Sequence, residues 1–368
     1  MLFDLYSCIC YIGCLAMTFF FTAKYEASLS CTKKQLWLLL SYVCVTGFCA
    51  IRFYVGNDYI NYVDGFNSIR QFGGINIYFW EPAYFLLNKI FIDCYAGYVY
   101  VFAIASIVSF GFLFKALINR GLLKWGVFYI FTLGVLIFLN DVIRQGIALS
   151  IFIYSLKYIE EARFGKYLLC ILGASMFHFS AIILLLVYLV RHIKISYYIW
   201  IILLVFVFIL QYTGIIRSIF LGILSFIPYY STYMDKADTY VVDVSPGLGI
   251  LYNFLMALMI AFVYRKSHPD TVITIYLIGS LLYVGAVGIA LFERIAFYLM
   301  YTNIIVFANF MRLPRYRQIS RVFAFMTLIY FSIQSLTGME KHGAVPYRTL
   351  INEDLENPPT EYLLEDDN

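Results

Sequence analysis

The stretch GYVYVFAIASIVSFGFLFKALI, residues 97–118, carries a single charged side chain, Lys115. A helix rises about 1.5 Å per residue, so roughly 20 apolar residues cross a hydrocarbon layer that is ~30 Å thick. This run is therefore predicted to be a transmembrane helix. Comparable runs recur along the chain, and we predict spans near residues 3–22, 36–51, 97–118, 124–140, 142–158, 197–212, 247–264, 271–291, 295–311 and 321–337.

The composition agrees with this pattern. Of the 368 residues, 62% are hydrophobic and only 13% are charged, which excludes an ordinary soluble domain. The 34 Tyr and 35 Phe are typical of membrane interfaces and of cavities that handle sugars. We predict an all-α polytopic membrane protein of about 10–12 transmembrane helices. Residues 1–337 form its single transmembrane domain, and residues 338–368 form an acidic tail that is largely disordered at its end.

Two apolar segments do not fit a simple span. Residues 81–94 are too short to cross, and the pair Glu81-Pro82 suits the first turn of an interfacial or re-entrant helix. Residues 166–190 form either one span or two half-helices broken near residues 175–180. Two polar outer loops are expected, one at 52–80 that carries a short interfacial helix and a larger one at 213–246.

The distribution of basic residues predicts the orientation. If the connections at 23–35, 115–124, 157–166, 191–195, 265–270 and 312–321 face the cytoplasm, they hold 17 of the 26 Lys and Arg and four of the 22 acids. Cytoplasmic loops are enriched in Lys and Arg, so this asymmetry places both termini outside. It also requires residues 166–190 to start and end inside, which favours the broken hairpin.

Several chemistries lack their motifs. The chain has no phosphate-binding Walker loop, no Rossmann glycine pattern, no HExxH helix and no GxSxG elbow. The net charge of +4 resides on predicted cytoplasmic loops, so it is a topology signal and does not indicate nucleic-acid binding. The eight Cys form no CxxC pair with companion ligands. We expect no cofactor, no metal site and no nucleic-acid partner.

Three arginines lie at predicted outer helix ends, where basic residues are otherwise scarce: Arg52, Arg144 and Arg294. The simplest interpretation is an interfacial arginine paired with a nearby acid, such as Asp141 before Arg144. Three arginines from distant parts of the chain at one depth instead favour a shared anion site. The planar guanidinium fork matches phosphate oxygens and stays charged at any working pH.

Three acid–base candidates accompany these arginines. Asp58 follows Gly56-Asn57, where the alternative is a turn that leaves the membrane. Glu81 opens the short helix, where an acid is also favoured by the helix dipole alone. His178 lies in the middle of an apolar run, where it is either a hydrogen-bonded core residue or a ligand or proton-transfer group at the break of the hairpin.

Together these segments resemble the EpsG-type family of Wzy-like polysaccharide polymerases. The resemblance covers roughly residues 50–350 and is carried by Arg52 with Val-Gly-Asn-Asp58 and Tyr62, Glu81-Pro82-Ala-Tyr84 with Asn88, Arg144-Gln145-Gly146-Ile-Ala-Leu, Phe177-His178-Phe-Ser180-Ala, Glu293-Arg294 and Pro346-Tyr347. No single motif is specific, but their order and loop context agree. Asn57 departs from the family pattern, where Thr or Ser is commoner.

The resemblance implies a membrane glycosyltransferase with a GT-C-like fold, acting at the periplasmic face of the bacterial inner membrane. It would make O-antigen, capsule or exopolysaccharide by transferring a growing glycan from undecaprenyl pyrophosphate to another lipid-linked repeat. Arg52, Arg144 and Arg294 would bind the pyrophosphate, and Asp58, with Glu81 or His178 as alternatives, would accept the acceptor's proton. The glycan would contact Tyr59, Tyr62, Trp80, Tyr84, Gln145 and Tyr233. No metal is required, and a chain-length regulator is a candidate partner.

Two other functions use similar groups. A flippase for lipid-linked oligosaccharide would also need arginines for pyrophosphate, but it predicts charges through the depth of the membrane and a pseudo-symmetric layout. A ligase that moves finished glycan to another acceptor shares nearly all of the chemistry. Only the family resemblance separates the polymerase from the ligase.

Overall fold

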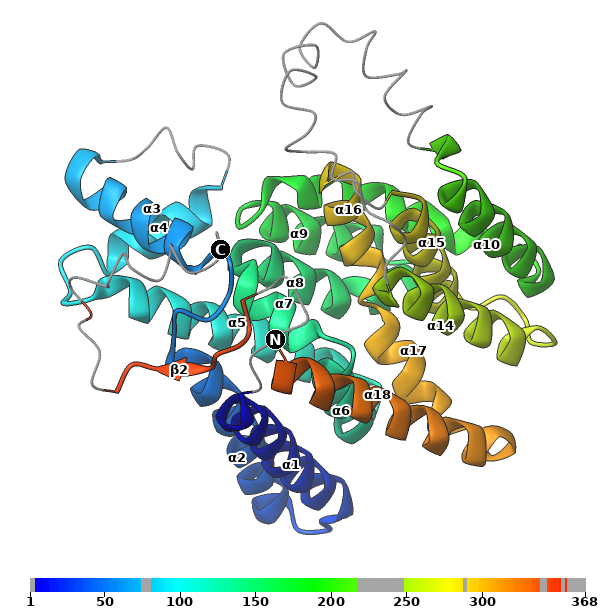
Figure 1. The fold of residues 1–368 in the computed structure, drawn as a ribbon, viewed down its shortest axis with the longest axis horizontal. Coiled ribbons are helices and arrows are strands. Elements are labelled where there is room, and N and C mark those ends of the chain that lie inside the picture. Colours follow the sequence, from blue (N-terminus) through cyan, green and yellow to red (C-terminus); the bar gives the residue numbers. More distant parts are fainter. Residues whose placement is uncertain are drawn as a thin grey trace, which may run out of the picture. The chain divides into compact units, whose positions relative to one another are not determined.

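The computed structural model describes residues 4–73, 81–216, 248–286, 290–337, 343–351 and 355 (Figure 1). Its elements are almost entirely helical, in the order α1 (Leu5–Ala27), α2 (Cys31–Ala50), β1 (Arg52–Phe53), α3 (Tyr59–Phe72), α4 (Pro82–Ile90), α5 (Gly97–Asn119), α6 (Leu123–Thr132), α7 (Val135–Asp141), α8 (Ile143–Glu160), α9 (Phe164–Ser175), η1 (Phe179–His192), α10 (Tyr197–Tyr212), α14 (Leu248–Tyr264), α15 (Thr271–Ala286), α16 (Ala290–Met300), α17 (Asn303–Phe310), η2 (Pro314–Tyr316), α18 (Arg317–Thr337) and β2 (Arg348–Thr349).

Three helical segments of the described residues are long and apolar enough to cross a membrane: α1, α5 and the stretch Pro314–Thr337. The pair α6 and α7 makes a fourth if the two are one bent span, and five further apolar helices have 10–17 residues. The prediction of an all-α polytopic membrane protein is confirmed. The two-residue strands β1 and β2 pair antiparallel, with Arg52 opposite Thr349.

The chain divides into two compact units whose segments alternate along the sequence. The first comprises Met1–Ser155, Leu168–Ile182 and Phe307–Asn368, and the second comprises Leu156–Tyr167 and Ile183–Val306. Helices α8, α9, η1 and α17 contribute residues to both units. The predicted single domain at 1–337 and the tail at 338–368 stay predictions.

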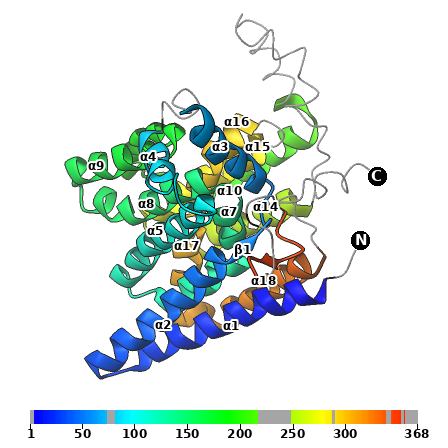
Figure 2. The same cartoon turned by 90° about the vertical axis from the view of Figure 1, so that its left-hand side faces the viewer.

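In the first unit, α1 and α2 pack side by side, α5 lies against α2, and α6 and α18 lie against α1 (Figure 2). Helix α1 begins where the Asp4 carboxylate accepts hydrogen bonds from the Ser7 amide, at 3.1 Å, and from the Ser7 hydroxyl, at 2.6 Å. The Asp4 amide donates to the Leu336 carbonyl at 2.9 Å, so the start of α1 lies beside the end of α18. The two helices are therefore antiparallel.

In the second unit, α10, α14, α15 and α16 pack on one another. Gly279 of α15 allows close approach, because a Cβ at this position would meet the backbone of Leu299 and Met300 in α16. The Tyr197 hydroxyl also accepts a hydrogen bond from the Asp270 amide at 2.8 Å. This contact joins the first residue of α10 to the start of α15.

Two predicted straight spans are broken. Residues 124–140 form α6 and α7, which meet at an angle of 63° because Gly134 adopts a left-handed φ of 78° between them. Residues 295–311 likewise divide into α16 and α17 at Tyr301–Thr302. Hydropathy alone does not reveal such breaks, because the apolar character continues through them.

The broken-hairpin prediction for residues 166–190 is confirmed in its main feature. Helix α9 ends at Ser175 and η1 begins at Phe179, so the break lies where it was expected. The rings of Phe164 and Tyr188 lie 4.9 Å apart, and the Tyr167 hydroxyl donates to the Leu184 carbonyl at 2.5 Å. The start of α9 therefore lies beside the later part of η1, as in a hairpin.

The polar segment after α2 contains a 14-residue helix, α3, at Tyr59–Phe72. Its buried residues, including Tyr59, Tyr62, Phe66 and Ile69, recur at helical spacing. Gly73 ends the helix in a left-handed conformation with φ of 73°. The predicted short helix after Glu81 is observed as α4, with Pro82 in its first turn.

Candidate active site

Three helix ends of the first unit meet at Glu81. This residue caps the N-terminus of α4, Arg144 lies in the first turn of α8, and His178 lies between α9 and η1. The Ala83 amide donates to the Met176 carbonyl at 3.0 Å, which ties the start of α4 to the end of α9. The helix boundaries at Pro82, Val142 and residues 176–178 therefore bring the starts of α4 and α8 and the end of α9 together.

Each oxygen of the Glu81 carboxylate has its own partner. Oε2 forms an ion pair with Nη1 of Arg144, and Oε1 lies 2.7 Å from Nδ1 of His178. Glu81 is buried, with 7% of the residue exposed, whereas the Arg144 side chain is 29% exposed. We refer to Arg144, Glu81 and His178 as the Glu81 cluster.

The Glu81 cluster holds an ionised carboxylate. Burial raises the pKa of Glu81, but the hydrogen bond to His178 and the charge of Arg144 together outweigh it, so the pKa of Glu81 lies below its ordinary value. The Nε2 atom of His178 is buried and has no hydrogen-bond partner among the described residues. The histidine thus directs one nitrogen to the carboxylate and leaves the other for a further partner.

Two tyrosines support the arginine. The Arg144 guanidinium carbon lies 5.6 Å from the ring centroid of Tyr62 and 5.7 Å from that of Tyr84, within the range of cation–π contact. Both tyrosines are buried, at 4% and 1% exposed. In this arrangement their ring faces contact protein, and their predicted role in stacking on sugar stays a prediction.

Arg52 lies in the core of the first unit. It is 1% exposed, and its guanidinium donates to the Cys49 carbonyl at 2.5 Å and to the Asn140 carbonyl at 3.3 Å. The Phe102 ring covers it at 5.1 Å. Arg52 thus joins the C-terminal ends of α2 and α7, two residues before α8 begins.

Asp58 lies near this junction. Its amide donates to the Asp141 carboxylate at 3.0 Å, and its own carboxylate accepts from the Asn61 side chain at 3.1 Å. The preceding Gly56 has a φ of 109°, and its amide donates to the Gly343 carbonyl at 2.9 Å. The Asp58 turn is therefore held by α7 on one side and by the C-terminal segment on the other.

The remaining predicted site residues are placed differently. Tyr59 and Gln145 are buried in the first unit, at 2% and 4% exposed. Arg294 is an exposed residue of α16 in the second unit. Trp80 and Tyr233 lie outside the described residues. The shared site of three arginines stays a prediction; among the described residues, Arg144 pairs with Glu81, which also contacts His178.

Sequence reasoning proposed Glu81 and His178 as separate alternatives and did not pair them. They are 97 residues apart, and no periodic pattern connects them. Asn140 and Tyr54 were not singled out, although Asn140 accepts from Arg52 and Tyr54 stacks on Tyr59 at 5.3 Å. Within the described ranges, no group of three or more His, Cys, Asp or Glu side chains is arranged to hold a metal ion.

The Glu81 cluster lies inside a region that matches a known family. The model of the EpsG family matches residues 35–349, which is most of the chain. No curated protein and no solved structure matches the chain. The matched region includes the Glu81 cluster, Arg52 with its two carbonyl partners, and the Asp58 turn. The chain belongs to the EpsG family.

Proposed function

We propose that this chain is a polysaccharide polymerase of the bacterial inner membrane. Membership of the EpsG family supports a role in polysaccharide polymerisation. In this proposal the chain transfers a growing glycan from undecaprenyl pyrophosphate to a lipid-linked repeat at the periplasmic face, without a metal. The observation that carries the proposal is the Glu81 cluster. It places around one buried carboxylate a partly exposed arginine and a histidine whose Nε2 atom has no hydrogen-bond partner among the described residues.

The leaving group requires a fixed positive charge. When the bond between the donor sugar C1 and the pyrophosphate oxygen breaks, both bonding electrons stay on that oxygen, and the pyrophosphate gains negative charge. Arg144 can stabilise this charge, because its position is fixed by Glu81 and by the rings of Tyr62 and Tyr84. Because the Arg144 guanidinium is already held in place, it does not have to reorganise when the leaving group forms.

The acceptor requires a base. Its sugar hydroxyl oxygen forms the new bond to C1 and must lose its proton. With Nδ1 donating to Glu81, the Nε2 atom of His178 carries the lone pair that can accept this proton, and the Glu81 carboxylate then stabilises the resulting imidazolium. A single displacement of this kind inverts the configuration at C1. Asp58 stays an alternative base, since it is partly exposed beside the same α7–α8 junction.

The experiment uses purified full-length chain in nanodiscs with a synthetic undecaprenyl-pyrophosphate repeat and no ATP or sugar nucleotide. A ladder of multimers is expected. Arg144→Ala is expected to slow ladder formation by about 10²–10³-fold, and Arg144→Lys by roughly tenfold because lysine keeps the charge but loses the planar fork. His178→Ala is expected to cost about 10²–10⁴-fold.

Matched controls are available in the same protein. Arg70→Ala removes an exposed arginine in the last turn of α3, and His192→Gln removes the histidine that ends η1. Both should leave the ladder intact. If His178→Ala keeps the ladder and Asp58→Asn abolishes it, Asp58 is the base instead. A folded native protein that forms no ladder but moves the lipid-linked repeat across the bilayer would show a flippase.

A further inference from the structure

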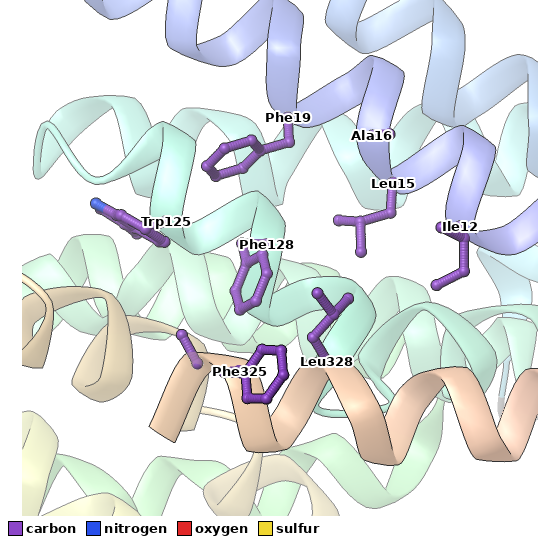
Figure 3. A pocket seen from close by; sticks show the side chains of 9 residues that line it. Ile12, Leu15, Ala16, Phe19, Trp125, Phe128, Phe325 and Leu328 are labelled. Carbon is purple, nitrogen blue, oxygen red and sulfur yellow. The ribbon is translucent and has the colours of Figure 1, made fainter. Parts of the chain in front are cut away.

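A second feature of the first unit is an apolar groove between α1, α6 and α18. It has a volume of about 390 Å³, within the range of ligand pockets of ~300–1,000 Å³. Its lining consists of Ile12, Leu15, Ala16, Phe19, Trp125, Phe128, Ala324, Phe325 and Leu328, all of them apolar (Figure 3). The groove opens to the outside of the unit, since Phe325 is 63% exposed.

The groove lies beside one end of the three helices. The ring of Phe19 lies 5.5 Å from that of Trp125 and 5.9 Å from that of Phe128, so the later half of α1 faces the start of α6. The Glu26 carboxylate accepts from the Lys124 amide at 3.0 Å, which fixes the same two ends together. Because α18 runs antiparallel to α1, its N-terminal residues lie at this end too.

Basic side chains occur on all three helices at this end. Lys124 precedes Trp125 in α6, and its ammonium lies 5.2 Å from the Trp125 ring. Arg321 precedes Ala324 by three residues in α18, and Arg312 donates to the carbonyls of Arg120 and Gly121 in the turn before α6. We refer to Lys124, Arg312 and Arg321 as the basic rim. Lys24 of α1 is not part of it, because its ammonium lies 5.3 Å from the ring of Phe20, which contacts Trp37 of α2.

The opposite end of α1 contacts the C-terminal segment that holds the Asp58 turn. There the Ser7 hydroxyl accepts from the Tyr347 amide at 2.5 Å, and the Tyr347 hydroxyl donates to the Phe48 carbonyl near the end of α2. Helix α1 has 23 residues, which gives a length of roughly 35 Å between the two ends. The basic rim and the C-terminal segment that holds the Asp58 turn therefore lie at opposite ends of α1.

We propose that the groove and its basic rim bind an anionic phospholipid, with an acyl chain along the apolar lining and the headgroup phosphate among Lys124, Arg312 and Arg321. An apolar slot that ends in cations matches an amphipathic ligand with a negative head. The count of basic residues predicts that this end faces the cytoplasmic leaflet, where anionic lipids carry the surface charge. This inference is independent of the proposed polymerase activity.

The test follows the fluorescence of Trp125. The full-length variant with Trp37, Trp80 and Trp200 replaced by phenylalanine is reconstituted in phosphatidylcholine nanodiscs that contain a small fraction of lipid with brominated acyl chains. Brominated phosphatidylglycerol is expected to quench Trp125 with an apparent affinity about fivefold higher than brominated phosphatidylcholine. The combined change Lys124→Gln, Arg312→Gln and Arg321→Gln should abolish this preference.

The charge-matched control is Lys33→Gln, Lys34→Gln and Arg315→Gln, which removes three cations from the same predicted face but outside the groove. It should keep the preference. Ala324→Phe should fill the groove and weaken quenching by both lipids. For the unaltered chain, native mass spectrometry should retain phosphatidylglycerol in preference to phosphatidylcholine. Equal quenching by the two lipids, loss of the preference in the control, or stronger quenching by a brominated polyprenyl phosphate would overturn the proposal.

Discussion

At the scale of single residues, the Glu81 carboxylate is the group on which the candidate site depends. Its two oxygens bind two different cationic or protonatable partners, and its burial strengthens both interactions relative to water. Glutamine in its place keeps the size of the side chain but removes the charge. One of its two polar atoms becomes an NH₂ group, so it cannot accept from Arg144 and His178 at once.

The depressed pKa of Glu81 gives a prediction with a definite sign. A carboxyl whose pKa is lower in the folded state stabilises the fold above its unfolded pKa, near 4.5, and this contribution is lost as pH falls through the folded pKa. Glu81→Gln should therefore lower the melting temperature at pH 7, and the difference from the native chain should shrink below pH 4.5. Thermal unfolding in detergent between pH 7 and pH 3 measures this difference in melting temperature. A constant difference down to pH 3 would contradict the prediction.

Arg52 differs from Arg144 in its surroundings, because it lies in the core of the first unit and not at a partly exposed site. Its guanidinium is buried and donates to two helix-end carbonyls. Arg52→Lys should lower the free energy of unfolding by about 2–4 kcal/mol, because a lysine cannot satisfy both carbonyls in the same plane. If the arginine only positions α7, the KM for lipid-linked substrate should be unchanged in the fraction of protein that remains folded.

Comparing Arg52→Lys with Arg144→Lys distinguishes an arginine that stabilises the fold from one that acts in polymerisation. Arg144→Lys should affect the rate of polymerisation more than stability, since its side chain is 29% exposed. A large rise in KM for Arg52→Lys at native stability would support the prediction that Arg52 binds pyrophosphate. An arginine at the end of an apolar run is compatible with both roles, and only the surrounding packing distinguishes them.

At the scale of secondary-structure elements, a C-terminal strap holds the Asp58 turn. We define the strap as residues 343–350. Its strand β2 pairs with β1, the Tyr347 ring stacks on Phe48 at 4.4 Å, and the Gly343 carbonyl accepts from the Gly56 amide. The strap lies about 290 residues after the turn that it holds, so no local signal in the sequence could have predicted this contact.

Gly343 is the most sensitive point of the strap. Its φ is 57°, and a Cβ there would lie 2.7 Å from Oδ1 of Asn57 and 3.0 Å from its amide nitrogen. Gly343→Ala should therefore destabilise the protein by about 1–2 kcal/mol from backbone strain alone. The measurement is the melting temperature of the purified variant, together with its rate of ladder formation.

Gly13→Ala is the control, because Gly13 lies within α1 and a Cβ there would contact nothing within 4 Å. This change should leave stability unchanged or raise it slightly, since alanine is the better helix former. A Gly343→Ala protein as stable and active as the Gly13→Ala protein would show that the strap does not position the Asp58 turn.

At the scale of the whole molecule, apolar run length predicted most helices, because a bilayer demands about 20 apolar residues wherever the chain crosses. It did not predict the bend at Gly134, since this bend depends on backbone conformation, and the short helix expected within the loop 52–80 is observed as α3. Nor could it pair Glu81 with His178, because contacts between distant helix ends are set by packing rather than by periodicity.

The predicted orientation is the last property to test, and both functional proposals depend on it. Single-cysteine variants are labelled with a membrane-impermeant maleimide that passes the outer membrane. One keeps only Cys31, which is exposed in the predicted cytoplasmic connection 23–35, and the other carries Asn57→Cys in a chain without other cysteines. Asn57→Cys should label in intact cells, whereas Cys31 should label only after the inner membrane is permeabilised.

The reverse pattern would contradict the orientation inferred from the basic residues. It would place the Asp58 turn in the cytoplasm and the basic rim of the groove outside, where it would meet the opposite leaflet. A periplasmic polymerase would then lack support, although the geometry of the Glu81 cluster would be unchanged. Labelling of both cysteines after permeabilisation is the control that each position is accessible, because an unlabelled site is informative only when the thiol can react.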